Sequence, residues 1–295
     1  MSLSTVICQN LPCLRLTLPS QDTVLVALHG AQVLSWQTGD GRERLYLSPQ
    51  AVMDGQAAIR GGVPVCFPQF NTRGLLPKHG FVRHSAWQPM GNPTDAAAQA
   101  QDTAQTQGAV QNLQLAFHHR IGSQPSIDAL WPHPFELLLT VRLAPNSLHM
   151  ALQVRNTGAH ALPFTVALHT YLAVQQLAQV RLHGLDSLRY WDALTDTHPV
   201  HAGDWRYGGP FDAVFPAAPT PLVLHDQACA LEITQSPNLA NTVVWNPGPA
   251  LSQQLADMPD DGYQHMLCVE AGQIDAPVLL APGEQWLGWQ HLRAL

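Results

Sequence analysis

The sequence predicts an all-β protein, and three observations support this. Apolar and polar residues alternate with a period of two through much of the 295-residue chain, as in strands that bury one face. Proline is frequent, with 24 residues, and separates the alternating runs, as expected of many short strands. Only residues 250–257 hint at a short helix. At this length the chain forms one large domain or two smaller ones, and the evenly spread strands favour a single sandwich or barrel over residues 1–295.

The clearest strands lie in the middle of the chain. Residues 111–120, 135–143 and 148–154 each carry an apolar side chain at every second position. Turn residues at 144–147 separate the second and third runs, and turn residues at 156–158 follow the third. This arrangement predicts antiparallel strands joined as a meander. Shorter strands are predicted at 24–36, 43–47, 162–168, 222–224, 229–234, 242–246, 266–270 and 285–292.

Residues 94–110 are rich in Ala and Gln and contain no β-branched run. The strand pattern resumes on both sides of them. We therefore expect a surface loop or mobile hairpin tip at this position, and not a domain linker.

Composition excludes several classes of function. Only 12% of the residues are charged, the formal net charge is −7 and the isoelectric point is about 6.1, which argues against a general nucleic-acid or anionic-membrane binder. No segment has the ~20 apolar residues of a membrane helix, and no basic-then-apolar signal peptide opens the chain. The five cysteines lack CxxC or zinc-site spacing, so we expect reduced thiols, no metal and a cytoplasmic protein.

Residues 58–87 are the best candidate for a binding site. This stretch, AIRGGVPVCFPQFNTRGLLPKHGFVRHSAW, is too broken by Gly and Pro to be a regular helix. Its apolar residues can anchor it in a core: Val63, Val65, Phe67, Phe70 and Phe81. Its polar residues Arg60, Gln69, His79 and Arg83 then suit a site for a polar ligand, although a long connection with solvated arginines fits the same composition.

Four segments resemble the aldose 1-epimerase superfamily, and within it the glucose-6-phosphate 1-epimerase (hexose-6-phosphate mutarotase) branch. They are VALHGAQVLSW at 26–36, IRGGVPVCFPQF with PKHGFVR in the stretch above, VALHTYLAV at 166–174 and DMPDDGYQHMLCVEAG at 257–272. The resemblance implies a single large antiparallel β-sandwich of the galactose-mutarotase type (a supersandwich), with a sugar site in its concave face. It also implies a small hexose phosphate as ligand, no cofactor and a monomer.

The resemblance assigns the acid and the base. His169 follows a predicted strand, where a lone histidine is more often a surface or core residue, but it matches the family's acid in the HTY segment. Glu270 ends an apolar strand, where a carboxylate turned to water is equally plausible, but it matches the family's general base, with Ala271 in place of proline. Ring opening of a hexose needs one base on the O1 proton and one acid at the ring oxygen. We expect a nearby carboxylate to keep His169 protonated.

Further residues are assigned to substrate binding. The resemblance implies that Arg60 and Arg83 line the sugar-phosphate site, because a guanidinium binds phosphate through two parallel hydrogen bonds. His79 is the expected second imidazole, and Gln69 a hydroxyl ligand. Asp212 in PFDAVF resembles the family carboxylate that holds sugar hydroxyls, and Asp192 competes with it at lower rank. Lys78 and Arg73 are expected at the rim.

One departure bears on the substrate. In the hexose-phosphate branch an aromatic residue and then a lysine follow Trp-Asn-Pro, but here Trp245-Asn246-Pro247 is followed by neither. This leaves three hypotheses open: a hexose-6-phosphate 1-epimerase, an aldose 1-epimerase acting on unphosphorylated sugars, and a non-catalytic sugar-binding sandwich. The two arginines Arg60 and Arg83 favour the first hypothesis, and the missing lysine favours the second. The acid–base pair argues against the third.

Overall fold

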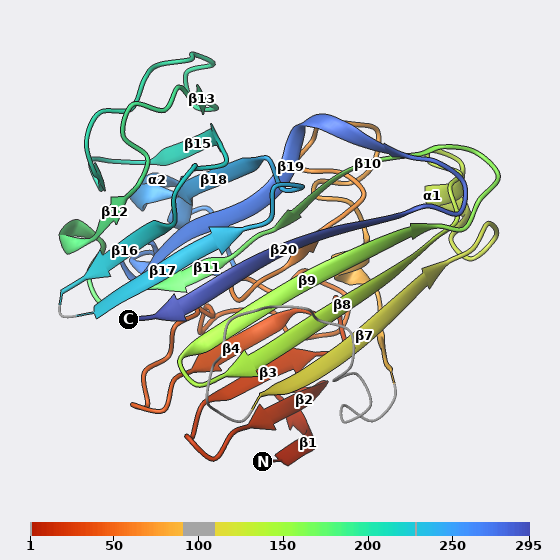
Figure 1. The fold of residues 1–295 in the computed structure, drawn as a ribbon, viewed down its shortest axis with the longest axis horizontal. Coiled ribbons are helices and arrows are strands. Elements are labelled where there is room, and N and C mark those ends of the chain that lie inside the picture. Colours follow the sequence, from red (N-terminus) through yellow and green to blue (C-terminus); the bar gives the residue numbers. More distant parts are fainter. Residues whose placement is uncertain (1, 91–109, 228) are drawn as a thin grey trace.

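The computed structural model describes residues 2–90, 110–227 and 229–295, whose strands form three antiparallel sheets (Figure 1). The four-stranded sheet contains β1 Ser2–Cys8, β2 Leu11–Thr17, β3 Thr23–Ala27 and β4 Val33–Gln37. The seven-stranded sheet contains β5 Val65–Cys66, β10 Leu162–Leu168, β11 Tyr171–Ala173, β13 Trp191–Asp192, β15 Phe211–Pro216, β18 Asn241–Asn246 and β19 Met266–Leu280. The nine-stranded sheet contains β6 Gln88–Pro89, β7 Gln111–His119, β8 Phe135–Ala144, β9 Ser147–Asn156, β12 Arg181–His183, β14 Trp205–Arg206, β16 Leu222–Asp226, β17 Cys229–Gln235 and β20 Gln285–Ala294.

Helices are few and short in the described residues. They are α1 Pro125–Asp128 and α2 Gly248–Ser252, with 3-10 turns η1 Val82–His84, η2 Leu177–Gln179 and η3 Gly262–His265. None of them is long and apolar enough to cross a membrane. The predicted all-β fold with few short helices is therefore confirmed, whereas a single domain over 1–295 stays a prediction.

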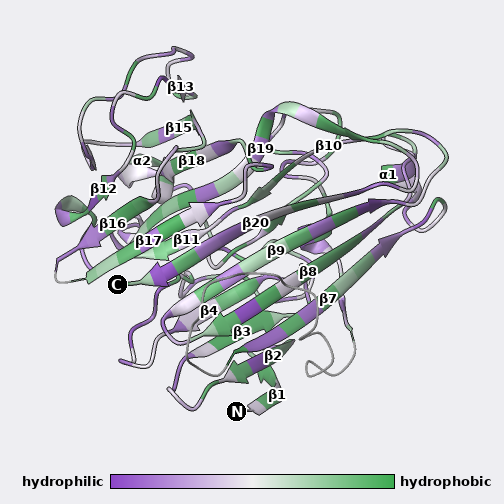
Figure 2. Cartoon of the chain, in the orientation of Figure 1, coloured by the Kyte–Doolittle hydropathy of each residue, from purple (hydrophilic) through white to green (hydrophobic). Residues whose placement is uncertain are grey.

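One large core joins the three sheets. It draws buried side chains from β2, β3 and β4, from β7 to β10, and from β15, β18, β19 and β20. Figure 2 shows hydrophilic and hydrophobic residues alternating along the long neighbouring strands β7, β8, β9 and β20. This period of two lets one face of the nine-stranded sheet cover the core while the other meets solvent.

The seven-stranded sheet has a second, chemically different face. Ala213, Val244 and Val269 lie opposite one another across β15, β18 and β19 and belong to the core. Because side chains alternate along a strand, the neighbouring row points the other way. That row runs from Asp212 through Trp245 and Cys268 to Tyr171 on β11, and therefore collects polar and aromatic groups outside the core.

The strand predictions agree best with the structure for β7 to β10 and for β16, β17, β18 and β20, whereas β19 continues ten residues beyond the predicted 266–270 and the strands β1, β2 and β11 to β15 were not predicted. Predictions near the start of the chain also differ in detail. The predicted strand 24–36 is two strands, β3 and β4, because Gly30 and Ala31 turn the chain with positive φ of 68° and 47°. Residues 43–47 make only isolated bridges. The helix hinted at 250–257 is α2, which begins and ends earlier. The loop predicted at 94–110 falls almost entirely outside the described residues.

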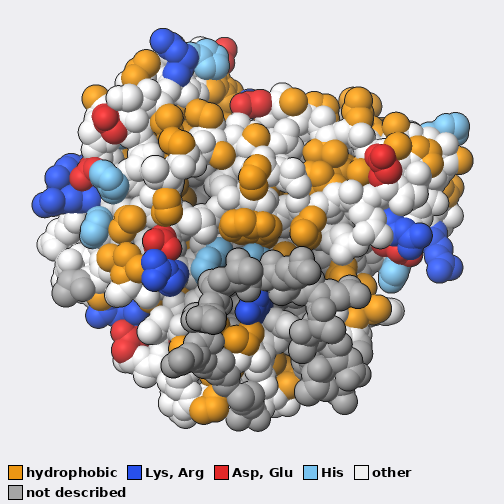
Figure 3. Space-filling model, in the orientation of Figure 1, with side chains coloured by type: hydrophobic (Ala, Val, Ile, Leu, Met, Phe, Trp, Pro, Cys, Tyr) orange, Lys and Arg blue, Asp and Glu red, His pale blue; other side chains and the backbone are white. Residues whose placement is uncertain are grey.

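Charged side chains are sparse on the face shown in Figure 3. Its Lys and Arg residues occur in small groups separated by uncharged surface. No basic stripe crosses the part of this face that the structure describes.

Candidate active site

A hollow of about 240 Å³ opens over the second face of the seven-stranded sheet. It is lined by Arg60, Phe70, Asn71, Lys78, His79, Arg83, His169, Tyr171, Asp212, Val243, Trp245, Leu251, Leu255 and Glu270. Six of the seven predicted site residues thus line one pocket, all except Gln69. Their chemical roles stay predictions, but the structure brings them together from four distant parts of the sequence.

The stretch 58–87 reaches this pocket because its apolar residues are buried beneath it. The predicted anchors are 5% exposed or less: Val63, Val65, Phe67, Phe70 and Phe81. Gly80, at φ 72°, packs so closely that an added Cβ would lie 2.0 Å from the Phe67 carbonyl oxygen. Only glycine fits there, and its tight turn holds the neighbouring polar residues at the pocket.

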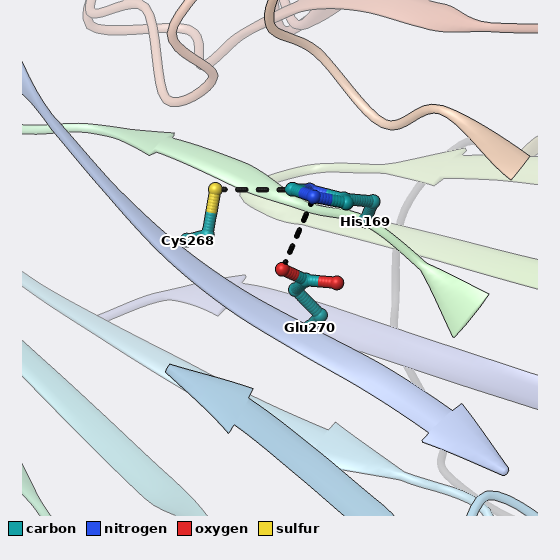
Figure 4. Close-up of side chains that lie close together, drawn as sticks. All are labelled: His169, Cys268 and Glu270. Atoms are coloured by element: carbon teal, nitrogen blue, oxygen red, sulfur yellow. Dashed lines mark hydrogen bonds and ion pairs between the residues drawn. The ribbon is translucent and has the colours of Figure 1, made fainter. Parts of the chain in front are cut away.

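His169 lies where the strand paired with β19 is interrupted. β10 ends with Leu168 opposite Ala271, and β11 starts with Tyr171 opposite Cys268. The His169 amide donates to the Pro64 carbonyl instead, at 3.0 Å. The interruption turns the imidazole over β19, where its Nε2 lies 3.3 Å from Oε1 of Glu270 (Figure 4).

Gln290 of β20 supports this interruption from the core side. Its amide nitrogen donates to the Val269 carbonyl at 3.0 Å, and its amide oxygen accepts from the Thr170 hydroxyl at 2.5 Å. Gln290 and Thr170 are both fully buried. The Gln290 amide therefore fixes Val269, which precedes Glu270, and Thr170, which follows His169.

Replacement of Gln290 by Leu is expected to lower the free energy of unfolding by about 2–3 kcal/mol, because two buried polar groups lose their partner. Urea denaturation followed by tryptophan fluorescence measures the change. The control is Gln153→Leu, whose amide bonds the exposed Gln285 side chain and whose loss should cost less than about 0.5 kcal/mol. Equal losses in the two variants would show that the buried amide has no special structural role.

Aromatic rings fix the orientation of His169. Its ring stacks on Tyr171 at a centroid distance of 4.8 Å and an interplanar angle of 13°. Trp245 and His79 meet it edge to face, at 6.1 and 5.4 Å. The Tyr171 hydroxyl in turn accepts a hydrogen bond from Arg60 Nη1 at 3.2 Å. The imidazole is thus held on three sides and can present one edge to a ligand.

Burial controls the protonation of His169 and Glu270. It lowers the pKa of His169 well below its ordinary value, and His79, Arg83 and Arg60 add to the effect. Burial also raises the pKa of Glu270 well above its ordinary value, with Asp212 adding to the rise and Lys78 opposing it. The expected carboxylate is present beside His169, but it does not outweigh burial. His169 and Glu270 therefore hold one proton between them, and these two directions favour its position on Glu270 in the free protein.

His79 is a neutral hydrogen-bond donor. Its Nδ1 accepts from the Asn71 amide at 3.2 Å, so the ring proton lies on Nε2. Burial, with Arg83, Lys78 and Arg60 nearby, lowers the pKa of His79 to about 3. A neutral N–H suits the predicted contact with a sugar hydroxyl.

The cations of the pocket are not equivalent. Arg60 is paired with Asp257, whose two carboxylate oxygens lie 3.2 Å from its Nε. Arg83 donates to the Lys78 carbonyl at 2.8 Å, and its Nε has no partner among the described residues. No carboxylate of the described residues pairs with Arg83 or Lys78 within ion-pair distance, so these two side chains retain the charge that an anionic ligand would neutralise.

Gln69 is the predicted site residue that the structure places elsewhere. Its amide nitrogen donates to the Asn71 and Leu76 carbonyls at 2.9 and 3.0 Å, and its oxygen accepts from the Leu76 amide at 3.0 Å. It is 4% exposed. Gln69 thus holds the loop together and has no free group for a hydroxyl ligand.

The other ranked alternatives also lie off the pocket. Arg73 pairs with Asp275 at 3.6 Å and stacks over Trp191. Asp192 accepts from the Leu194 amide at 2.9 Å and caps a turn. Lys78, predicted at the rim, does line the pocket.

Several residues that line the pocket, or that contact a lining residue as Asp257 does, were not predicted. Tyr171 and Asp257 stand within the HTY and DMPDDGY segments, so the motif was visible but the contact of each with Arg60 was not. Leu251 and Leu255 line the pocket just beyond Trp245-Asn246-Pro247. The segment without the expected lysine therefore presents apolar side chains to the ligand space.

His169, Cys268 and Glu270 also form a group of three potential metal ligands within 4.8 Å of one another. However, Cys268 Sγ lies beside Nδ1 of the imidazole at 3.8 Å, and Glu270 Oε1 lies beside Nε2. An imidazole binds a given metal ion through only one of its two ring nitrogens, whereas Cys268 and Glu270 lie beside different nitrogens of His169. The arrangement therefore fits a hydrogen-bonded group better than a metal centre.

Comparison with known proteins identifies the family. A family model described as aldose 1-epimerase matches residues 12–293. The chain belongs to the aldose 1-epimerase family. It is 34% identical over 281 residues to a Cenchrus ciliaris protein named "putative glucose-6-phosphate 1-epimerase", covering 92% of this chain and 80% of the relative. An Escherichia coli K12 protein of the same name is 33% identical over 250 residues, covering 83% and 77%.

Solved structures of mutarotase-like proteins share the fold. A Salmonella typhimurium protein described as "a putative mutarotase" superposes with a TM-score of 0.83 at 29% identity, covering 99% of this chain and 93% of that one. A galactose mutarotase-like protein of Clostridium acetobutylicum gives 0.74 at 13% identity, covering 100% and 98%. The predicted galactose-mutarotase type of sandwich is confirmed, and the chain is a carbohydrate isomerase of the aldose 1-epimerase family.

Proposed function

We propose that this protein interconverts the α- and β-anomers of a hexose 6-phosphate. The observation that carries the proposal is the contact between Glu270 and His169 in a pocket that also holds Arg83 and Lys78, two cations with no ion-pair partner among the described residues. The two relatives at 33–34% identity bear a glucose-6-phosphate 1-epimerase name, which supports the same substrate.

The acid–base pair can carry a proton through the whole reaction. Transfer of the shared proton from Glu270 to His169 creates a carboxylate and an imidazolium. Glu270 then removes the O1 proton while His169 protonates the ring oxygen, and the pyranose opens to the aldehyde. Rotation about the C1–C2 bond exposes the other face of the carbonyl. On closure Nε2 of His169 takes the proton from the hydroxyl and Glu270 returns its proton to O1, which leaves an imidazolium beside a carboxylate. Transfer of the proton from His169 back to Glu270 then restores the starting state of the pair.

The remaining pocket groups suit a hexose. The neutral Nε2–H of His79 can donate to a sugar hydroxyl, and Asp212 can accept from one. Burial raises the pKa of Asp212, with Lys78 opposing the rise. Trp245 offers an apolar face to the ring. Arg83 and Lys78 would bind the phosphate, since charge-assisted hydrogen bonds to phosphate are the strongest available here.

A second candidate function is epimerisation of unphosphorylated aldoses. Leu251 and Leu255 favour it, because they line the pocket just beyond Trp-Asn-Pro, where the hexose-phosphate branch carries an aromatic residue and a lysine. The acid–base chemistry would be unchanged. The two candidates differ only in whether phosphate adds to binding.

The test of the proposal is anomer exchange itself. The protein should accelerate exchange between α- and β-glucose 6-phosphate more than exchange of free glucose. Equal acceleration of both sugars would favour the second candidate. A monomer and a cytoplasmic location also stay predictions.

A further inference from the structure

The Cys268 thiol lies beside the nitrogen of His169 that faces away from Glu270. Sγ is 3.8 Å from Nδ1, whereas Oε1 of Glu270 is 3.3 Å from Nε2 (Figure 4). Cys268 and Glu270 are two residues apart on β19, so their side chains point to the same face. Both ring nitrogens therefore have a polar neighbour from one strand.

The chemistry proposed above needs the two nitrogens to behave differently. Nε2 must gain and lose a proton as the sugar ring closes and opens. A neutral imidazole carries its hydrogen on one nitrogen and accepts at the other. For Nε2 to accept a proton during ring closure, the remaining hydrogen must lie on Nδ1 throughout. That hydrogen needs an acceptor, because His169 is only 8% exposed.

We propose that Cys268 is a positioning residue whose sulfur accepts the Nδ1–H of His169. The contact holds the imidazole in the Nδ1–H tautomer and leaves Nε2 as the nitrogen that exchanges protons. Three further residues, Tyr171, Trp245 and His79, meet the imidazole with their own aromatic rings. The role in catalysis rests on the proposed function, whereas the hydrogen bond is a property of the free protein.

Sulfur suits this position because it is a weak and uncharged acceptor. Burial raises the pKa of the Cys268 thiol well above its ordinary value, and Glu270 adds to the rise, so the group stays protonated. A carboxylate at this place would stabilise the imidazolium and weaken it as an acid. The thiol orients His169 without that effect, so the imidazolium remains a strong acid toward the ring oxygen.

Nitrogen-15 NMR of the free protein tests the tautomer directly. The protein is labelled with ¹⁵N-histidine, and the His169 resonances are assigned by their loss in His169→Gln. The expected result is a protonated Nδ1 at neutral pH. An unprotonated Nδ1, with the hydrogen on Nε2, would overturn the proposal whatever the activity of the protein.

Two variants test the sulfur. Cys268→Val keeps a similar volume without an acceptor and should move the hydrogen toward Nε2, lowering kcat roughly threefold to tenfold with KM within about twofold. Cys268→Ser retains an acceptor and should keep the Nδ1–H signal and most of the rate. The control is Cys13→Val, at a fully buried cysteine of β2, which should change neither the His169 spectrum nor the rate.

The outcomes separate this inference from the proposed function. Identical His169 spectra in Cys268→Val and the wild type would overturn the role of sulfur. Failure of the wild type to interconvert anomers would instead contradict the proposed function, while a protonated Nδ1 that depends on Cys268 would still support the hydrogen bond.

Discussion

Replacement of Glu270 by Gln is expected to lower kcat for anomer interconversion by about 10²–10⁴-fold. The amide has the shape of the carboxyl group and can still contact His169, but it cannot accept the O1 proton. It also removes the proton that the pair shares. Binding of the sugar phosphate should change little, because the cations that would hold the phosphate are untouched. Exchange NMR measures the rate, and isothermal titration calorimetry measures the binding.

The same variant should be as stable as the wild type or more stable at pH 7. The folded-state pKa of Glu270 is raised by burial. Because this pKa is raised, the stability that protonated Glu270 contributes is fully present below its unfolded-state pKa. That contribution is lost as the pH rises through its folded-state pKa. Gln cannot ionise, so it avoids this loss, and a lowered melting temperature at pH 7 would contradict the account of the buried carboxyl.

The control for this experiment is Asp192→Asn, at the carboxylate that the sequence ranks below Asp212 as a ligand for sugar hydroxyls. Its side chain caps a turn and lies off the pocket lining. Its rate should stay within about twofold of the wild type. A loss in Asp192→Asn as large as that in Glu270→Gln would move the base away from β19.

Replacement of Arg83 by Ala should raise the apparent KM for glucose 6-phosphate by roughly 10- to 150-fold, the equivalent of a charge-assisted hydrogen bond of about 1.5–3 kcal/mol. The effect on free glucose should be no more than about twofold. The reason is that the Arg83 guanidinium faces the pocket without an ion-pair partner among the described residues. Initial rates over a range of both sugars give the two KM values.

Arg73→Ala is the matched control for the loss of a nearby guanidinium. Arg73 is ten residues away in the sequence but pairs with Asp275 outside the pocket lining. Its removal should leave the ratio of the two KM values unchanged. If Arg83→Ala weakened glucose and glucose 6-phosphate equally, Arg83 would not be a phosphate ligand.

Much of the fold could be predicted because alternation records which face of a strand is buried. β7, β8 and β9 are long and bury one face, so their pattern is clear. β1 was not predicted, since most of its residues are exposed and alternate little. The division of 24–36 depends on a turn with positive φ at Ala31, a residue type that gives no turn signal of its own.

The site was predicted from motifs more than from patterns, and its electrostatics were not predicted. Residue type cannot tell that burial makes His79 neutral or that it leaves the shared proton on Glu270, because both depend on the surrounding chain. Gln69 shows the same limit. Its amide looks free in the sequence, but the folded loop uses every polar atom of it.

The most direct measurement is the anomer exchange rate of glucose 6-phosphate, with free glucose alongside, by exchange NMR at low temperature. Low temperature slows the uncatalysed reaction and leaves the catalysed rate visible. The account predicts acceleration by the wild type that is much greater for the phosphate ester and is lost in Glu270→Gln. Binding of both sugars with no acceleration of either would contradict it and leave a sugar-binding sandwich with an unused acid and base.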